Sequence, residues 1–248
     1  MSQQLVTALD RVEQHTGTRG AFLRKAGIGA ALAGGGVLLA RPGVALAGHD
    51  DRIPDVDILN YALTLEYLEA SFYTQALGGA GTTGVPTSSA AFGRGDITGS
   101  SIFDGFGGRI RSSAYGYLTD IRDHEVVHVE FLRSALGSAA VRPCTFDFSS
   151  ALASVEAFID TAQVLENTGV MAYDGAIRYV DAGDVLQAGA QIATVEARHA
   201  AYLNLINRDS PFPSAFDEGK PPSAIFAAAD PFIVSCPAAV GALFGRLP

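Results

Sequence analysis

Four stretches of the chain repeat apolar residues at spacings of three and four, the pattern of helices with one buried face. Three of them cover about residues 55–77, 109–136 and 150–180, and the fourth runs from a short turn at 181–184 to about 207. No strand pattern of any length appears, because apolar and polar residues nowhere alternate in a sustained way. The pattern predicts an all-α fold, an antiparallel four-helix bundle.

The ends of these helices carry recognisable signals. Pro54 and the aspartate that follows it favour the start of the first helix, and Gly137 favours the end of the second. Either Ser149 or Ser150 can cap the third helix. Because the turn at 181–184 is short, the third and fourth helices should be antiparallel neighbours.

The remaining segments predict connections without regular structure. Residues 78–108 form a loop rich in Gly, Thr and Ser, and residues 138–148 form a long crossover between the second and third helices. Beyond Pro211 the tail is rich in Pro, Ala and Phe. We expect irregular structure packed on the bundle there, with one short helix at about 223–229.

The N-terminal segment has the organisation of an export signal. Basic residues precede an apolar, glycine-rich run at 26–40, and Ala45-Leu46-Ala47 offers the small residues that a signal peptidase reads. The apolar run is too short and too rich in glycine for a transmembrane helix, which needs about 20 strongly apolar residues. The predicted organisation is a cleaved signal, a short linker, the bundle and a tail, at residues 1–47, 48–54, 55–207 and 208–248.

The route of export is left open between two pathways. Residues 18–24 resemble the twin-arginine signal, but Gly20 stands where that signal has its second arginine, so the general secretory route is the alternative. We expect a protein of the periplasm, the cell envelope or the extracellular space. The residue directly after the predicted cleavage site is Gly48 and not a cysteine, so no lipid or membrane anchor is expected after cleavage.

Composition and charge exclude some classes of partner. With 48% hydrophobic and 17% charged residues the chain belongs with compact globular proteins. Its net charge is −9, and loss of residues 1–47 leaves 12 basic and 24 acidic residues, a net charge of −12. Without a basic patch to neutralise phosphates, nucleic acid is not an expected partner. A monomer or dimer is expected rather than a cage.

The mature chain keeps both cysteines of the sequence, Cys144 and Cys236. In an oxidising compartment two cysteines commonly form a disulfide, which here would join the crossover to the C-terminal tail. The alternative is two free buried thiols.

The motif Glu-x-x-His occurs in two helices, from Glu125 to His128 and from Glu196 to His199. A spacing of three puts both side chains on one helix face, and in both helices that face is the apolar one. Nine Glu and five His in 248 residues would give only about 0.2 such pairs by chance. The alternative is two solvated surface pairs, but a buried carboxylate beside an imidazole indicates an ion pair or a metal site.

The other two helices carry matching carboxylates. Glu66 precedes Tyr73 by seven residues, as Glu166 precedes Tyr173, so an offset of 100 residues relates the first and third helices. A bundle with pseudo-twofold symmetry would bring four carboxylates and two imidazoles together, which is the ligand set of di-iron and di-manganese bundle sites. The candidate metal ligands are Glu66, Glu125, His128, Glu166, Glu196 and His199.

Residues 57–69 and 122–128 resemble the ferritin-like superfamily, and within it the exported bacterial proteins related to plant desiccation-related proteins. The resemblance covers about residues 55–207. It implies the ferritin-like bundle, and it implies bridging and terminal metal ligands at the positions of the same six residues. Tyr73 matches a tyrosine often found beside such sites, and Tyr173 repeats it. Family membership implies the fold more firmly than an activity.

Several assignments remain open at this stage. Glu69 is an additional or alternative ligand to Glu66, although the repeat favours Glu66 because Gly169 stands opposite Glu69. His124 lies off the main apolar stripe, where it would be solvated or would support a ligand. The two tyrosines are either core residues or redox-active or hydrogen-bonding partners of the site.

The ligand set favours a function that uses two metal ions. The first hypothesis is a di-iron ferroxidase or oxidase that reacts with O2 or peroxide. The second is a dimanganese centre that breaks down hydrogen peroxide, as in manganese catalases, because iron and manganese take the same donors. A third is a stress-protective or desiccation-protective structural protein without catalysis. The long loop at 78–108 is an observation that favours this hypothesis.

Overall fold

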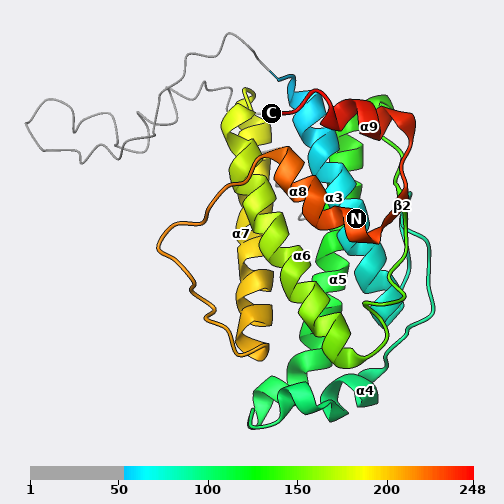
Figure 1. Ribbon diagram of the computed structural model, residues 1–248, viewed down its shortest axis with the longest axis vertical. Helices are drawn as coiled ribbons and strands as arrows, with labels where there is room; N and C mark the ends of the chain where they lie inside the picture. The colour runs from blue at the N-terminus through cyan, green and yellow to red at the C-terminus, as the bar shows by residue number, and fades with distance from the viewer. Residues whose placement is uncertain (1–52) are drawn as a thin grey trace, which may run out of the picture.

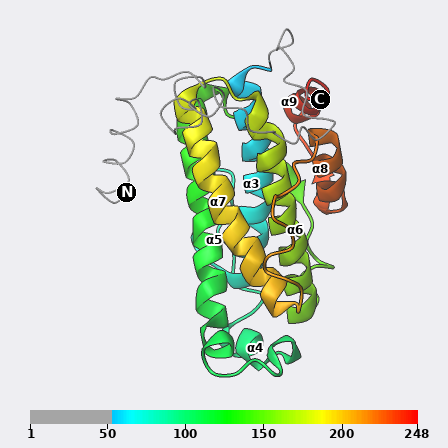
Figure 2. The ribbon, with the colours of Figure 1, turned by 90° about the vertical axis from the view of Figure 1, so that its left-hand side faces the viewer.

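The computed structural model describes residues 53–248, and the predicted export segment lies outside that part of the chain. Four long helices form an antiparallel bundle (Figures 1 and 2). They are α3 (Asp55–Leu77), α5 (Arg109–Leu136), α6 (Val155–Ala176) and α7 (Gly183–Ile206). The crossover after α5 returns along the bundle, so α6 runs parallel to α5 (Figure 1). The predicted all-α fold with a long crossover is confirmed.

Helix α3 is buried almost throughout, since other bundle helices and the C-terminal tail cover it. It begins after Pro54 without a side-chain cap. The aspartate expected to cap it, Asp55, instead accepts hydrogen bonds from the backbone N–H groups of Asp181 and Ala182, each at 2.9 Å. Asp55 therefore fastens the turn between α6 and α7 to the start of α3.

The predicted start and end of the third helix are both wrong by a few residues. Helix α6 begins at Val155, and Ser154, rather than Ser149 or Ser150, caps it by accepting from Ala157 N–H. The earlier serines belong to a turn in which Asp147 accepts from Ser149 N–H. At the other end α6 stops at Ala176, and a 3₁₀ turn, Ile177–Tyr179, follows it.

The segment expected to be a loop between α3 and α5 contains some regular structure. Helix α4 (Arg94–Gly99) and the 3₁₀ turn Ser101–Phe103 lie across one end of the bundle (Figure 1). Ile97 and Phe103 are fully buried there. Such short helices depend on tertiary burial, because a six-residue helix is not stable alone.

The C-terminal tail packs on the bundle and is more regular than predicted. Helix α8 (Pro222–Ala229) matches the expected short helix, while α9 (Ala238–Phe244) was not expected. A short strand, β2 (Ile233–Ser235), pairs antiparallel with β1 (Thr145–Phe146) of the crossover. These strands have two and three residues, too few for a sequence pattern.

The predicted disulfide is present between Cys144 and Cys236, next to the paired strands. It links residues 92 positions apart and so holds the tail against the crossover. The tail also needs Gly175 on α6, because the Lys220 carbonyl oxygen lies 2.0 Å from the point where a Cβ would be placed.

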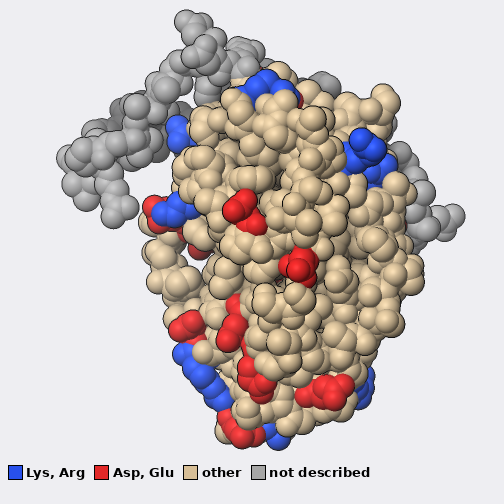
Figure 3. Space-filling view, turned by 45° about the vertical axis from the view of Figure 1, so that its right-hand side comes forward, with Lys and Arg blue, Asp and Glu red and all other residues tan. Residues whose placement is uncertain are grey.

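Among residues 53–248, no helix combines the length and the apolar character needed to cross a membrane. On the face drawn in Figure 3, acidic side chains are more numerous toward the α4 end of the bundle than toward the other end. The charges are spread over a largely uncharged surface on that face.

Candidate metal centre

The six candidate ligands lie inside the bundle, with at least one from each of the four long helices. The four glutamates, Glu66, Glu125, Glu166 and Glu196, have no exposed surface. His128 and His199 are 8% and 5% exposed. Each Glu-x-x-His pair occupies one turn of the inner face of α5 or α7, as the spacing of three predicts.

Potential ligand atoms form two groups, each gathered within 4.8 Å. One group contains Glu66 and His128, and the other contains Glu166 and His199. Glu125 and Glu196 belong to both groups. The geometry is therefore that of two adjacent positions, each with its own carboxylate and imidazole, joined by two shared carboxylates.

Both imidazoles turn the Nδ1 atom toward the carboxylates. His128 Nδ1 lies 3.2 Å from Glu66 Oε2, 3.2 Å from Glu125 Oε2 and 3.1 Å from Glu196 Oε1. His199 Nδ1 lies 3.0 Å from Glu125 Oε1 and 3.1 Å from Glu166 Oε2. The two Nδ1 atoms, one from each ligand group, thus both lie close to the shared carboxylates.

The two tyrosines connect the halves of the bundle. Tyr73 on α3 donates to Glu166 Oε1 on α6 at 2.7 Å, and Tyr173 on α6 donates to Glu66 Oε1 on α3 at 2.5 Å. Burial, followed by the neighbouring carboxylates, raises the pKa of both hydroxyls well above 10, so both remain donors. Each tyrosine occupies one oxygen of its carboxylate and leaves the other, Oε2, facing a histidine.

His124 supports one of the imidazoles. Its ring stacks on His199 with the centroids 5.2 Å apart, and its Nδ1 lies 2.9 Å from His199 Nε2. Burial and the neighbouring His199 lower the pKa of His124, which favours a neutral ring able to accept a proton. If His199 Nε2 carries a proton donated to His124, then Nδ1 is left with the lone pair that a metal needs.

Glu69 is buried beside the six candidate ligands but belongs to neither group of atoms. Its Oε1 lies 3.2 Å from the position of a Cβ on Gly169, so the missing side chain at 169 makes room for this carboxylate. Burial, followed by repulsion from Glu196 and Glu166, raises the pKa of Glu69 well above its usual range. Its role as an alternative ligand stays a prediction.

The donor set fits metal cations. Glu125 Oε1 and both oxygens of Glu196 are buried and accept no hydrogen bond. Histidine nitrogens are near them, but without the alignment that a hydrogen bond requires. Within the described chain, no Lys or Arg forms an ion pair with any of the six residues. Buried carboxylates without a basic partner need protons or metal ions to balance their charge.

Without metal, the centre holds protons. Burial raises the pKa of Glu66 to about 8, although His128 acts in the opposite direction. Burial also raises the pKa of Glu166 well above its usual range. Burial opposes charge on His199, yet Glu166 and the shared carboxylates raise its pKa to about 12. A metal ion must therefore displace protons from a carboxylate and from the imidazoles.

We expect metal affinity to rise with pH for this reason. Between about pH 6 and pH 7, below the pKa of both Glu66 and His199 in the metal-free protein, each proton released on binding should tighten binding by about tenfold per pH unit. Calorimetric titration with Mn²⁺ in two buffers of different ionisation enthalpy would count the protons released. An affinity that does not change over this range would contradict the expectation.

Two other acidic residues of α5 lie away from the centre. Glu130 lies on the outside of α5, where it accepts from Thr82 Oγ1, and Asp123 pairs with Arg122 on the surface. The sequence indicated the six candidate ligands, but it did not reveal the contact between His124 and His199. The available signal is a histidine directly before the Glu-x-x-His motif of one helix, here His124 on α5. It contacts the histidine of the motif on the neighbouring helix, His199 on α7.

Comparisons with known proteins agree with the bundle fold. The sequence model of a family described as "Ferritin-like domain" matches residues 54–208. Protein rds1 of Schizosaccharomyces pombe is 31% identical over 114 residues, which cover 46% of this chain. Those residues make up 28% of the yeast protein, so the match spans less than a third of that relative's length.

Proposed function

The chain belongs to the ferritin-like family, and on that basis we propose that it is an exported di-iron protein, a ferroxidase or oxidase that reacts with dioxygen. The observation that carries the proposal is the pair of ligand groups that share Glu125 and Glu196. A shared pair of carboxylates is the arrangement that holds two metal ions side by side in ferritin-like carboxylate bundles.

Each part of the centre has a task in this reaction. Glu66 with His128, and Glu166 with His199, would each bind one ion. The two tyrosines would hold the terminal carboxylates in place through their Oε1 atoms. Two ferrous ions bound here would each supply one electron, so that one dioxygen and two protons yield one hydrogen peroxide.

Burial serves the same chemistry. The four glutamates have no exposed surface, so water does not compete for their oxygens. Carboxylates are hard anionic donors that stabilise ferric iron more than ferrous iron, which favours loss of the electrons. His124 would keep the His199 ring oriented throughout.

Export and an oxidising destination are part of the proposal. The disulfide between Cys144 and Cys236 supports it, since such bonds persist mainly in oxidising compartments. Together with the signal-like sequence at residues 1–47, it favours a protein of the periplasm, cell envelope or extracellular space.

Elemental analysis of the purified protein, followed by addition of ferrous iron, tests the proposal. We expect two metal ions per chain, and consumption of one dioxygen for every two ferrous ions as the electron balance requires. Bound manganese with rapid breakdown of hydrogen peroxide would replace the proposal with a dimanganese catalase. A stable protein that binds no metal would indicate a structural, non-catalytic role.

A further inference from the structure

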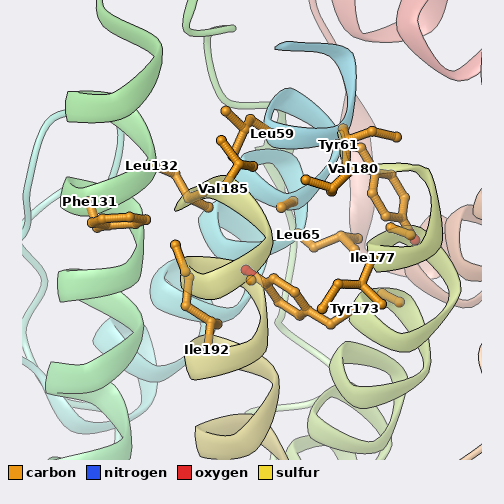
Figure 4. Close-up of a pocket in the computed structure, with 16 residues that line it drawn as sticks. Leu59, Tyr61, Leu65, Phe131, Leu132, Tyr173, Ile177, Val180, Val185 and Ile192 are labelled. Atoms are coloured by element: carbon orange, nitrogen blue, oxygen red, sulfur yellow. The ribbon is translucent and has the colours of Figure 1, made fainter. Parts of the chain in front are cut away.

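An apolar cavity lies next to the metal centre, on the side of the turn between α6 and α7 (Figure 4). Its volume is about 40 Å³. Ala62, Leu132 and Ile192 line it, and each stands one helical turn from a candidate ligand, namely Glu66, His128 and Glu196 in that order. The cavity is thus the next layer of the bundle beyond the ligands.

Tyr173 joins the cavity to the centre. Its ring is part of the cavity wall (Figure 4), and its hydroxyl donates to Glu66 Oε1 at 2.5 Å. One side chain therefore touches both the empty space and a candidate ligand, so a molecule in the cavity lies a single side chain away from the metal positions.

The internal repeat explains why the cavity forms at this end of the bundle. An offset of 100 residues pairs Phe72 with Ala172 and Phe158 with Ile58, and an offset of 71 pairs Leu118 with Gly189. The larger members are fully buried at the opposite end, toward α4, where they fill the core. Their smaller counterparts all line the cavity: Ile58, Ala172 and Gly189.

The chemistry of the side chains that line the cavity determines which small molecule can bind in it. The lining side chains are hydrocarbon apart from the hydroxyls of Tyr61 and Tyr173, and the latter is engaged by Glu66. Hydrogen peroxide would lose most of its hydrogen bonds to water on entering, which is costly. Dioxygen has none to lose and is favoured by an apolar space, and the volume exceeds the roughly 10–15 Å³ that one water-sized molecule needs.

We propose that this cavity is a binding chamber for dioxygen that supplies the metal centre from the side of Tyr173. The inference rests on the proposed function, and it names dioxygen rather than peroxide as the oxidant. The chamber holds an apolar diatomic molecule beside the ligands, while larger side chains fill the corresponding positions at the opposite end.

A substitution copied from the opposite end of the bundle tests the chamber. Gly189→Leu introduces the residue that the chain uses at 118, and a Cβ at 189 meets only Ile177 at 3.8 Å, an ordinary contact. Gly116→Leu on α5 is the matched control, because a Cβ there has no neighbour within 4 Å. Both variants replace a helical glycine by leucine, so their effects on helix propensity are equal.

Xenon is the first probe, because it is apolar and requires neither metal nor activity. In crystals under xenon pressure we expect a xenon atom in the chamber of the native protein and of Gly116→Leu, and none in Gly189→Leu. Native protein without xenon at this position would overturn the proposal. Ala172→Leu, on a different helix, fills the same space and should also exclude xenon should Gly189→Leu fail to fold.

The second readout compares oxidants on the iron-loaded protein. Filling the chamber should slow oxidation by dioxygen several-fold and leave oxidation by hydrogen peroxide unchanged. Equal loss with both oxidants, or no loss with either, would overturn the proposal. Failure of the native protein to react with dioxygen at all would instead refute the proposed function, while xenon binding would still report whether the chamber exists.

Discussion

Replacing Glu125 or Glu196 with glutamine is expected to abolish binding of both metal ions, whereas the same change at Glu66 or Glu166 should remove only one. The first two carboxylates contribute to both ligand groups, and the latter two contribute to one group each. Removing one partner of a buried charge interaction costs about 3–5 kcal/mol, or roughly two to four orders of magnitude in affinity. Elemental analysis after dialysis against a weak chelator gives the metal count.

Matched controls make this result specific. Glutamine keeps the size of the side chain, so the core should stay packed. Glu130→Gln on the outer face of α5 should retain both ions, since Glu130 contacts Thr82 rather than the centre. Two ions in Glu196→Gln would rule out shared ligation. Glu69→Gln should keep two ions, and loss of one would identify Glu69 as a ligand.

Removal of the disulfide is expected to lower the free energy of unfolding more than any of the substitutions described above. For a closed loop of 92 residues, the loop-entropy model gives about 4–5 kcal/mol. The double variant Cys144→Ser and Cys236→Ser should unfold at correspondingly lower denaturant concentration than the oxidised protein. Its metal content should not change, because the six candidate ligands lie on the four bundle helices and not on the crossover or the tail.

Reduction of the native protein provides an independent control for this experiment. The reduced protein should match the double serine variant in its free energy of unfolding. A loss below about 1 kcal/mol in both would show that strand pairing and the packing of α8 and α9 hold the tail without the covalent link.

The bundle and its inner face could be predicted because the relevant signals are local. Helical periodicity marks a buried stripe, and the Glu-x-x-His spacing places two candidate ligands on one turn without any tertiary information. The repeat at an offset of 100 then pairs Glu66 with Glu166. These signals identified all six side chains that the fold brings together.

Features that depend on distant parts of the chain could not be predicted in this way. Three serines precede α6, and only the turn held by Asp147 determines that Ser154 is the cap. Helix α9 and the two short strands depend on contacts between the tail and the crossover. The cavity forms at one end of the bundle because Phe72 and Leu118 fill the core at the other end. The repeat reveals this difference only once the packing is known.

The crossed tyrosine contacts have a consequence for assembly. Each helical hairpin, α3 with α5 or α6 with α7, carries half of the donors, and its tyrosine anchors a carboxylate of the other hairpin. Neither hairpin can therefore coordinate an ion fully by itself. A bound ion favours the docked arrangement over the separated one by mass action. If the centre binds metal as proposed, metal binding would favour only the arrangement in which the two hairpins have docked in the correct register.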